Sequence, residues 1–208
     1  MKILITDDHK IVRDGLKEIL KQVPDIETIT EANDGSEALA LCHSNNFDLI
    51  LLDISLPDMT GLEVLQTLIR KKPAQKVLIL SMHPQEQYAL RALKLGASGY
   101  LTKSTAAEEL IIAVMRINAG GKYISSSLAE NIALHLDKDF SKPLHDSLSE
   151  REFEIMIKIA AGKPLHEIGN ELCISGKTVS TYRSRIMEKM GLTKNAELIQ
   201  YCIRNGLV

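Results

Sequence analysis

The chain has few cysteines and no long apolar run, and both absences narrow its class. Its three cysteines, Cys42, Cys173 and Cys202, lie far apart and form no Cys-x-x-Cys pair, so the sequence predicts neither a disulfide framework nor a zinc site. No stretch approaches the roughly 20 apolar residues that a membrane-spanning helix needs. The N-terminus passes directly from an apolar run to acidic residues, unlike a signal peptide. We therefore expect a cytoplasmic protein without membrane insertion.

The net charge is also small, because 25 Lys and Arg residues face 27 Asp and Glu residues. Such a balance says nothing about partners until it is divided by region. Residues 177–194 carry five basic residues, opposed only by Glu188. This local excess is a modest electrostatic footprint for a polyanion, although solvated helices often carry similar runs.

Residues 1–120 alternate short apolar runs with amphipathic stretches. In the latter, apolar residues recur every three or four positions, as in Leu62, Leu65 and Leu68, a spacing typical of helices. Strands separated by helices of this length predict an α/β fold, a doubly wound five-stranded parallel sheet of the flavodoxin-like type. The expected strands are Ile3–Ile5, Glu27–Ala32, Leu49–Leu52, Val77–Leu80 and Tyr100–Leu101.

The pattern changes after residue 120. The pair Gly120-Gly121 ends a helical pattern. Residues 121–146 become polar and hold one expected short helix near Leu128 to Leu136, so they predict a linker. Residues 147–208 are wholly helical in pattern and predict an all-α domain of four helices. Ser149 and Glu152 form a capping box that begins the first of them.

Polar side chains follow four of the five expected strands. They are Asp7 and Asp8 after the first strand, Asp53 after the third, Ser81 after the fourth and Lys103 after the fifth. Strand ends of an open parallel sheet form a ligand-binding crevice, so we expect these side chains to converge. Each residue alone could simply cap a helix, but helix caps explain neither the lysine nor the doubled aspartate.

This set of side chains suits phosphoryl transfer. Three carboxylates packed together require a cation, and oxygen ligands with room for water and a phosphate favour Mg²⁺. Together with Lys103, Mg²⁺ would balance the charge of a phosphoryl group on one aspartate, and Ser81 could donate a hydrogen bond to it. Positioning and charge stabilisation are the main requirements of this chemistry.

Residues 1 to about 120 resemble the receiver domain of a two-component response regulator. The resemblance rests on motifs of specific order and spacing: Asp7-Asp8, Asp53 with Pro57 and Gly61, Ser81, and Gly99-Tyr100-Leu101-Thr102-Lys103. It implies that Asp53 accepts a phosphoryl group from a histidine kinase and later loses it slowly by hydrolysis.

The same resemblance implies roles for the neighbouring residues. Asp8, Asp53 and the backbone carbonyl of Ser55 would bind Mg²⁺, with Asp7 acting through water, and Lys103 would contact the phosphate. Ser81 and Tyr100 would form a switch pair, in which the hydroxyl moves toward the phosphate and the ring swings inward. His83 could orient the water that attacks the phosphoryl group, or it could be a solvated residue that enters a helix.

The all-α domain contains the pattern of a helix-turn-helix, two helices joined by a tight turn. We expect Val179, Tyr182, Ile186 and Met190 on the inward face of the second of these helices. Small hydroxyl side chains on its outer face would permit close approach to a major groove, and basic side chains would meet phosphates or guanine edges. The candidate DNA-binding residues are Lys177, Thr178, Ser180, Thr181, Arg183, Ser184, Arg185 and Lys189. An ordinary amphipathic helix with a solvated side is the alternative.

Residues 148–208 are similar to the DNA-binding domain of the LuxR family, NarL/FixJ type. The similarity rests on Leu148-Ser149-Glu150-Arg151-Glu152, Ala161-Gly162-Lys163, Lys177-Thr178-Val179 and Lys189-Met190-Gly191. The pair Tyr182-Arg183 resembles the GacA/UvrY branch of that family.

A receiver joined to such a domain implies a bacterial transcription regulator. Phosphorylation of Asp53 would favour dimerisation and promoter binding, because paired modules read two half-sites together. The implied partners are a sensor histidine kinase, double-stranded promoter DNA and a second copy of the chain.

Two other functions stay open. A phosphatase of the haloacid dehalogenase type also forms an aspartyl phosphate, but it needs a second acid where this chain has Ser55. A regulator could also bind DNA without phosphorylation, which the intact acidic residues and lysine make less favourable. We therefore expect a regulatory protein rather than an enzyme.

Overall fold

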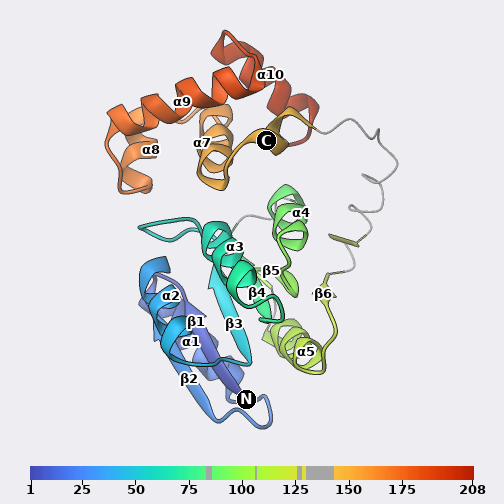
Figure 1. Cartoon of the computed structure of the whole chain (residues 1–208). Helices are drawn as coiled ribbons and strands as arrows, with labels where there is room; N and C mark the ends of the chain where they lie inside the picture. Colours follow the sequence, from blue (N-terminus) through green and yellow to red (C-terminus); the bar gives the residue numbers. More distant parts are fainter. Residues whose placement is uncertain (83–85, 106, 126–127, 130–142) are drawn as a thin grey trace. The chain divides into compact units, whose positions relative to one another are not determined.

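The computed structural model describes residues 1–82, 86–105, 107–125, 128–129 and 143–208. The chain divides into two compact units, Met1–Lys138 and Asp139–Val208 (Figure 1). His83 and most of the short helix expected near Leu128 to Leu136 lie outside the described residues. Among the described helices, none has the length and apolar character needed to span a bilayer.

The first unit is built on one parallel sheet in the order β2-β1-β3-β4-β5-β6. The strands are β1 (Lys2–Thr6), β2 (Thr28–Ala32), β3 (Leu49–Asp53), β4 (Val77–Ser81), β5 (Gly99–Thr102) and β6 (Tyr123–Ile124). The five expected strands and the doubly wound parallel fold are confirmed. The sixth strand was not expected, because two residues are too few for an alternating apolar pattern to reveal.

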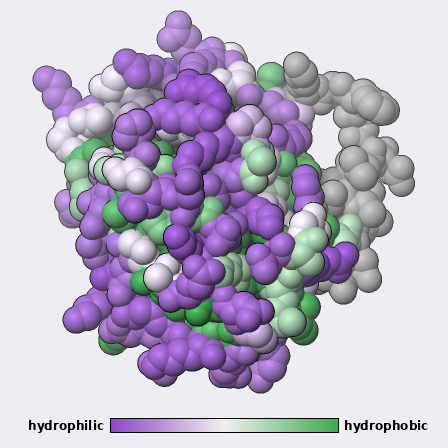
Figure 2. Space-filling model, turned by 60° about the horizontal axis from the view of Figure 1, so that its bottom comes forward, coloured by the Kyte–Doolittle hydropathy of each residue, from purple (hydrophilic) through white to green (hydrophobic). Residues whose placement is uncertain are grey.

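Helices cover both faces of this sheet. They are α1 (Lys10–Leu20), α2 (Gly35–Ser44), α3 (Gly61–Lys71), α4 (Glu86–Lys94) and α5 (Ala107–Asn118). Leu49 and Leu51 of β3 belong to the core cluster that includes α1 and α5, and the alternate residues Ile50 and Leu52 are equally buried. Burial on both faces explains why the central strands are continuous apolar runs. On the face shown in Figure 2, hydrophilic side chains predominate.

The second unit is helical, as expected. After a short 3₁₀ helix, η1 (Leu144–Ser147), come α7 (Glu150–Ala160), α8 (Leu165–Glu171), α9 (Gly176–Met190) and α10 (Asn195–Arg204). The Ser149–Glu152 capping box begins α7, as predicted. The core of this second unit includes fully buried side chains from three helices, namely Phe153, Ile186 and Leu198.

One expectation for α9 was wrong. Val179, Ile186 and Met190 are buried as predicted, and so is Met187. Tyr182, expected inward, is only half-buried. Its ring lies at the border between the apolar and polar faces, where a helical periodicity cannot distinguish core from surface.

Candidate functional site

The carboxyl ends of β1, β3 and β5 bring three charged side chains together. The Nζ atom of Lys103 lies 2.7 Å from Oδ2 of Asp53 and 2.6 Å from Oδ2 of Asp7. All three side chains are buried, with exposed fractions of 8%, 3% and 1% for Lys103, Asp53 and Asp7. A buried ammonium held between two buried carboxylates is therefore the centre of this pocket.

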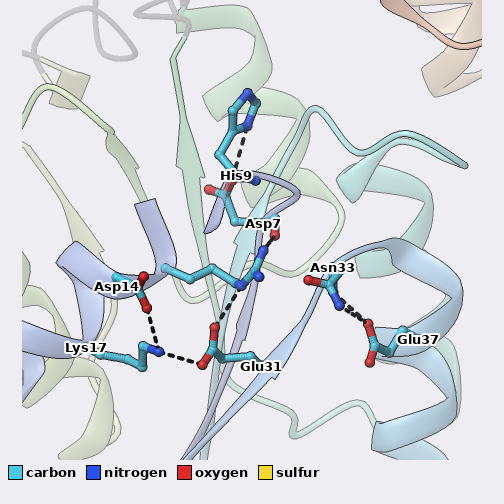
Figure 3. Close-up of polar contacts among 8 residues, drawn as sticks. Asp7, His9, Asp14, Lys17, Glu31, Asn33 and Glu37 are labelled. Atoms are coloured by element: carbon cyan, nitrogen blue, oxygen red, sulfur yellow. Dashed lines mark hydrogen bonds and ion pairs between the residues drawn. The ribbon is translucent and has the colours of Figure 1, made fainter. Parts of the chain in front are cut away.

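Asp8 lies at the more open side of the pocket. Its side chain is 34% exposed, and its Oδ1 atom lies 2.6 Å from Nδ1 of His9. The backbone N–H of His9 donates to Oδ1 of Asp7 at 2.9 Å, and Nδ1 of its ring lies 3.5 Å from the same oxygen (Figure 3). Sequence reasoning missed His9, although a histidine directly after an acidic pair was a signal available in the chain. The backbone N–H of His9 fixes the orientation of the Asp7 carboxylate.

A second residue that sequence reasoning missed holds the same turn in place. The buried Arg13 donates from a terminal nitrogen to the backbone oxygen of Asp7 at 2.6 Å and from Nε to Glu31 at 2.8 Å. Lys17 bridges Glu31 and Asp14, as Figure 3 shows. Hydrogen bonds from Lys17 and Arg13 lower the pKa of Glu31, so the network stays charged and anchors the end of β1 to α1 and β2.

The electrostatics of Asp53 follow from its burial. Burial raises the pKa of this carboxyl from 3.8 to about 6, although Lys103 opposes the rise. Burial alone would lower the pKa of Lys103, but Asp53 and Asp7 outweigh it and raise that pKa. The lysine thus stays protonated, while Asp53 is easier to protonate than an ordinary aspartate.

The donor set fits a divalent cation. Asp7, Asp8 and Asp53 carry three negative charges against the single charge of Lys103 when all are ionised, which leaves an excess of about two. Oδ2 of Asp7 is buried and, apart from its ion pair with Lys103, has no hydrogen-bond partner among the described residues. Carboxylate oxygens with one open side are the environment that Mg²⁺ prefers.

The loop after β3 is held at both ends. Ser55 forms a β-bridge with Thr60, and the Ser55 backbone N–H donates to the Asp53 carboxylate. Asp58 accepts hydrogen bonds from the backbone N–H groups of Gly35 and Ser36 at 2.9 and 2.8 Å. The loop that carries Ser55 past Asp53 is therefore pinned to the beginning of α2.

The expected switch pair is in contact. Ser81 ends β4 and Tyr100 lies in β5, and their side chains are 1% and 3% exposed. Burial raises the pKa of Tyr100 to about 12, and a hydrogen bond with the Ser81 side chain opposes that rise. In this structure the Tyr100 ring is thus directed inward and bonded to Ser81.

The candidate DNA-binding residues of α9 divide into two groups. All but the half-buried Arg183 are exposed, and Lys189 keeps 43% of its side chain accessible. The first group consists of Lys177, Thr178, Ser180, Thr181, Ser184 and Arg185. The other two are held by neighbouring helices, because Arg183 donates from Nε to Oδ1 of Asn195 at 2.7 Å and Lys189 from Nζ to Oε2 of Glu152 at 2.7 Å. These two cations fix α9 against α10 and α7.

A surface hollow of about 340 Å³ lies along the exposed side of α9. Its lining combines two cations with hydroxyl side chains and one aromatic ring: Ser175, Lys177, Thr178, Thr181, Tyr182 and Arg185. Hydroxyl groups and cations around a hollow are suited to a nucleic-acid backbone. Tyr182 was not among the candidate contacts, since its periodicity suggested the core.

Two protein families match separate parts of the chain. The family described as "Response regulator receiver domain" matches residues 3–115, and "Bacterial regulatory proteins, luxR family" matches residues 146–202. The chain belongs to the response regulators of the LuxR type. This family consists of DNA-binding transcription regulators of two-component systems and not of enzymes.

Two curated relatives match this response regulator along its whole length, and a solved structure matches part of it. It is 36% identical over 212 residues to "Response regulator GacA" of Pseudomonas aeruginosa, covering 100% of this chain and 98% of GacA. It is 34% identical over 208 residues to "Response regulator UvrY" of Escherichia coli K12, covering 100% and 95%. A solved structure of a LuxR-family response regulator from an Aurantimonas species is 35% identical with a TM-score of 0.62, covering 65% of this chain and 96% of that one.

Proposed function

We propose that Asp53 accepts a phosphoryl group from a sensor histidine kinase and that phosphorylation favours a DNA-binding dimer. The observation that carries this proposal is the position of Lys103, whose ammonium contacts both Asp53 and Asp7 in a buried pocket. An ammonium beside a carboxylate nucleophile is placed to balance the charge of an incoming phosphoryl group.

The chemistry follows from the side chains present. An oxygen of ionised Asp53 attacks phosphorus, and the bond from phosphorus to the kinase histidine breaks. Lys103 shifts its ion pair from the carboxylate to the phosphoryl oxygens, and Ser81 donates a hydrogen bond to one of them. Asp7, Asp8, Asp53 and the Ser55 carbonyl would hold Mg²⁺, which supplies charge neutralisation at these oxygens when bound. Slow hydrolysis later returns the free carboxylate.

Phosphorylation then acts through the switch pair. Ser81 is hydrogen-bonded to Tyr100 and ends β4, the strand paired with β3, whose last residue is Asp53. A phosphoryl group on Asp53 that binds the Ser81 hydroxyl therefore also restrains the Tyr100 ring. This restraint biases the receiver toward a form that dimerises. The dimer presents two DNA-binding domains to two half-sites of promoter DNA.

On the DNA-binding domain, we assign contact with DNA to the exposed face of α9. Lys177 and Arg185 supply the positive charge there, while small hydroxyl side chains such as Ser180 and Ser184 permit close approach to the groove. Arg183 and Lys189 act on DNA binding through the packing of α9, because their charged groups are bonded within the domain.

We place the receiver at residues 1–120, the linker at 121–146 and the DNA-binding domain at 147–208. The family matches at residues 3–115 and 146–202 support these limits. Because promoter DNA of a bacterium lies in the cytoplasm, we place the protein there.

The test combines phosphorylation and DNA binding. Wild-type protein is incubated with acetyl phosphate and Mg²⁺, phosphate on Asp53 is detected by intact mass, and affinity for promoter fragments is measured by gel shift. We expect Asp53→Asn to lose both the mass increase and the phosphate-dependent gain in affinity. Glu18→Gln, which removes an equal charge from the exposed face of α1 outside the pocket, is expected to keep both. Phosphate-dependent dimerisation in the Asp53→Asn variant would contradict the proposal.

A further inference from the structure

The two-residue strand β6 lies along the edge of β5 (Figure 1). Its residues pair with Gly99 and Tyr100 in parallel register, Tyr123 opposite Gly99 and Ile124 opposite Tyr100. The backbone N–H of Tyr123 donates to the Ser98 oxygen at 2.9 Å. Strand β6 therefore pairs with the very segment of β5 that carries the switch residue Tyr100.

A side-chain contact also holds β6. The hydroxyl of Tyr123 donates to Oε1 of Glu109 on α5 at 3.0 Å. Tyr123 is thus fixed by its backbone to β5 and by its side chain to α5. Few contacts hold a strand this short, so its pairing is easily shifted by a small change in either neighbour.

Gly99 sets how closely the two strands approach. A Cβ atom at this position would lie 2.6 Å from the backbone oxygen of Tyr123 and 3.0 Å from Cδ1 of Leu78. Any larger residue would have to displace one of these atoms. The glycine directly before Tyr100 is therefore a requirement of the β5–β6 pairing.

Tyr100 links this edge to the phosphorylation site. Its ring is buried and bonded to Ser81, and Lys103 follows β5 directly and contacts Asp53. A displacement of Ser81 or Lys103 is thus passed to β5, a strand of four residues. The edge of β5 that does not pair with β4 pairs with β6. In the sequence, the residues after Ile124 connect β6 to the helical second unit.

We propose that β6 is a positioning strand that couples the Ser81–Tyr100 pair to the linker. This inference rests on the proposed phosphorylation of Asp53. A phosphoryl group that restrains Ser81 also restrains Tyr100 in its inward position, and the fixed β5 backbone strengthens its pairing with Tyr123 and Ile124. Strand β6 lies within the linker sequence 121–146. When β6 is paired, the first residues of the linker are fixed to the receiver sheet; when β6 is released, they are not.

Hydrogen exchange tests the coupling directly. Beryllofluoride, an analogue of the phosphoryl group, is added with Mg²⁺ to the full-length protein, and exchange of the Tyr123 amide is followed. We expect exchange to slow by about three- to tenfold, the effect of strengthening one net hydrogen bond. An unchanged exchange rate, at a beryllofluoride concentration that saturates Asp53, would overturn the inference.

Variants test whether β6 matters for the output. Tyr123→Phe and Glu109→Ala remove the α5 contact, and Gly99→Ala forces β6 away from β5. We expect all three to accept phosphate on Asp53 as the wild type does but to lose most of the phosphate-dependent gain in DNA affinity. Glu108→Ala, which changes an exposed neighbour of Glu109 on α5, is the matched control and is expected to keep the gain.

The outcomes separate this inference from the function on which it rests. If wild-type Asp53 is not phosphorylated at all, the proposed function fails. If Tyr123→Phe and Glu109→Ala are phosphorylated and keep the full gain in affinity, β6 is an ordinary edge strand and the inference is wrong. Should Gly99→Ala not fold, the other two variants decide the question, because they leave the backbone pairing free of steric conflict.

Discussion

The first residue of α3 is pressed against the backbone of the proposed phosphoacceptor: a Cβ atom on Gly61 would overlap the backbone oxygen of Asp53. The Gly61 N–H donates to the Ile54 oxygen at 2.7 Å, and the Thr60–Glu63 capping box begins the helix at this point. The eight-residue spacing between Asp53 and Gly61 is thus a packing requirement of the turn that positions the carboxylate.

Gly61→Ala should therefore impair phosphorylation. The added methyl group must push either α3 or the Asp53 backbone aside, at a cost of about 1–3 kcal/mol in the free energy of unfolding. A shift of the nucleophile by about 1 Å costs up to about a hundredfold in rate. Urea unfolding and the rate of phosphorylation by acetyl phosphate measure these effects.

Gly15→Ala is the control, because nothing lies within 4 Å of its Cβ position in α1. This variant should raise the free energy of unfolding by about 0.5–1 kcal/mol. An unchanged phosphorylation rate in Gly61→Ala would contradict the prediction.

The raised pKa of Asp53 predicts an unusual pH dependence of stability without metal. The folded protein binds this proton more tightly than the unfolded chain, with a pKa of about 6 against an ordinary value of 3.8. Its contribution to stability is therefore fully present below 3.8 and is lost as pH rises through 6. At pH 7 the contribution that has been lost is on the order of 3 kcal/mol, because each unit of difference between the two pKa values corresponds to about 1.4 kcal/mol. In EDTA, Asp53→Asn should be more stable than the wild type at pH 7 and about equal to it at pH 4, as measured by urea unfolding.

Asp58 provides the control of opposite sign. Burial alone would raise its pKa, but hydrogen bonds from Ser36 and Gly35 outweigh burial and lower it. The stability that Asp58 contributes is present above its ordinary pKa and is lost as pH falls. Because Asp58 is exposed and solvent screens its interactions, Asp58→Asn should lower the free energy of unfolding at pH 7 by at most about 1 kcal/mol, and the difference should vanish in acid. If Asp53→Asn and Asp58→Asn change the free energy of unfolding with pH in the same direction, the surroundings of Asp53 and Asp58 do not shift the two pKa values in opposite directions.

Magnesium should stabilise the folded receiver through the same carboxylates. A ligand that binds only the folded state adds about 2.7 kcal/mol at a hundredfold excess over its dissociation constant. Asp8→Ala and Asp53→Asn should lose most of this gain in thermal unfolding, whereas Glu18→Gln, on the exposed face of α1, should keep it. A gain that survives loss of both Asp8 and Asp53 would place the cation elsewhere.

The division among the cations of α9 predicts different salt dependences of DNA binding. Lys177→Ala and Arg185→Ala should each make the plot of log affinity against log salt less steep by about 1, because each removes one phosphate contact. Lys189→Ala should leave that slope unchanged and lower the stability of the domain by at most about 1 kcal/mol, since its ammonium pairs with Glu152. Identical slopes for all four proteins, wild type included, would show that the exposed face of α9 does not contact phosphate.

Sequence reasoning succeeded where position along an element determines position in space. Asp7, Asp53 and Lys103 could be expected together, because parallel strands end at one edge of a sheet. It did not anticipate the bonds of Arg183 and Lys189. A cation on the polar side of a helix looks alike in sequence whether it faces solvent or reaches a neighbouring helix, as these two reach Asn195 and Glu152.

The order of apolar and polar residues by itself determined five of the six strands, the helices that flank them, the capping box at Ser149 and the edge of the sheet where charge gathers, because these depend on neighbours along the chain. Only the tertiary structure decided that Arg13 holds the Asp7 backbone, that Tyr123 pairs with Gly99, and how far the pKa of Asp53 rises. Burial and contacts between distant segments exist only once the chain is packed, and those contacts set the energies at the site.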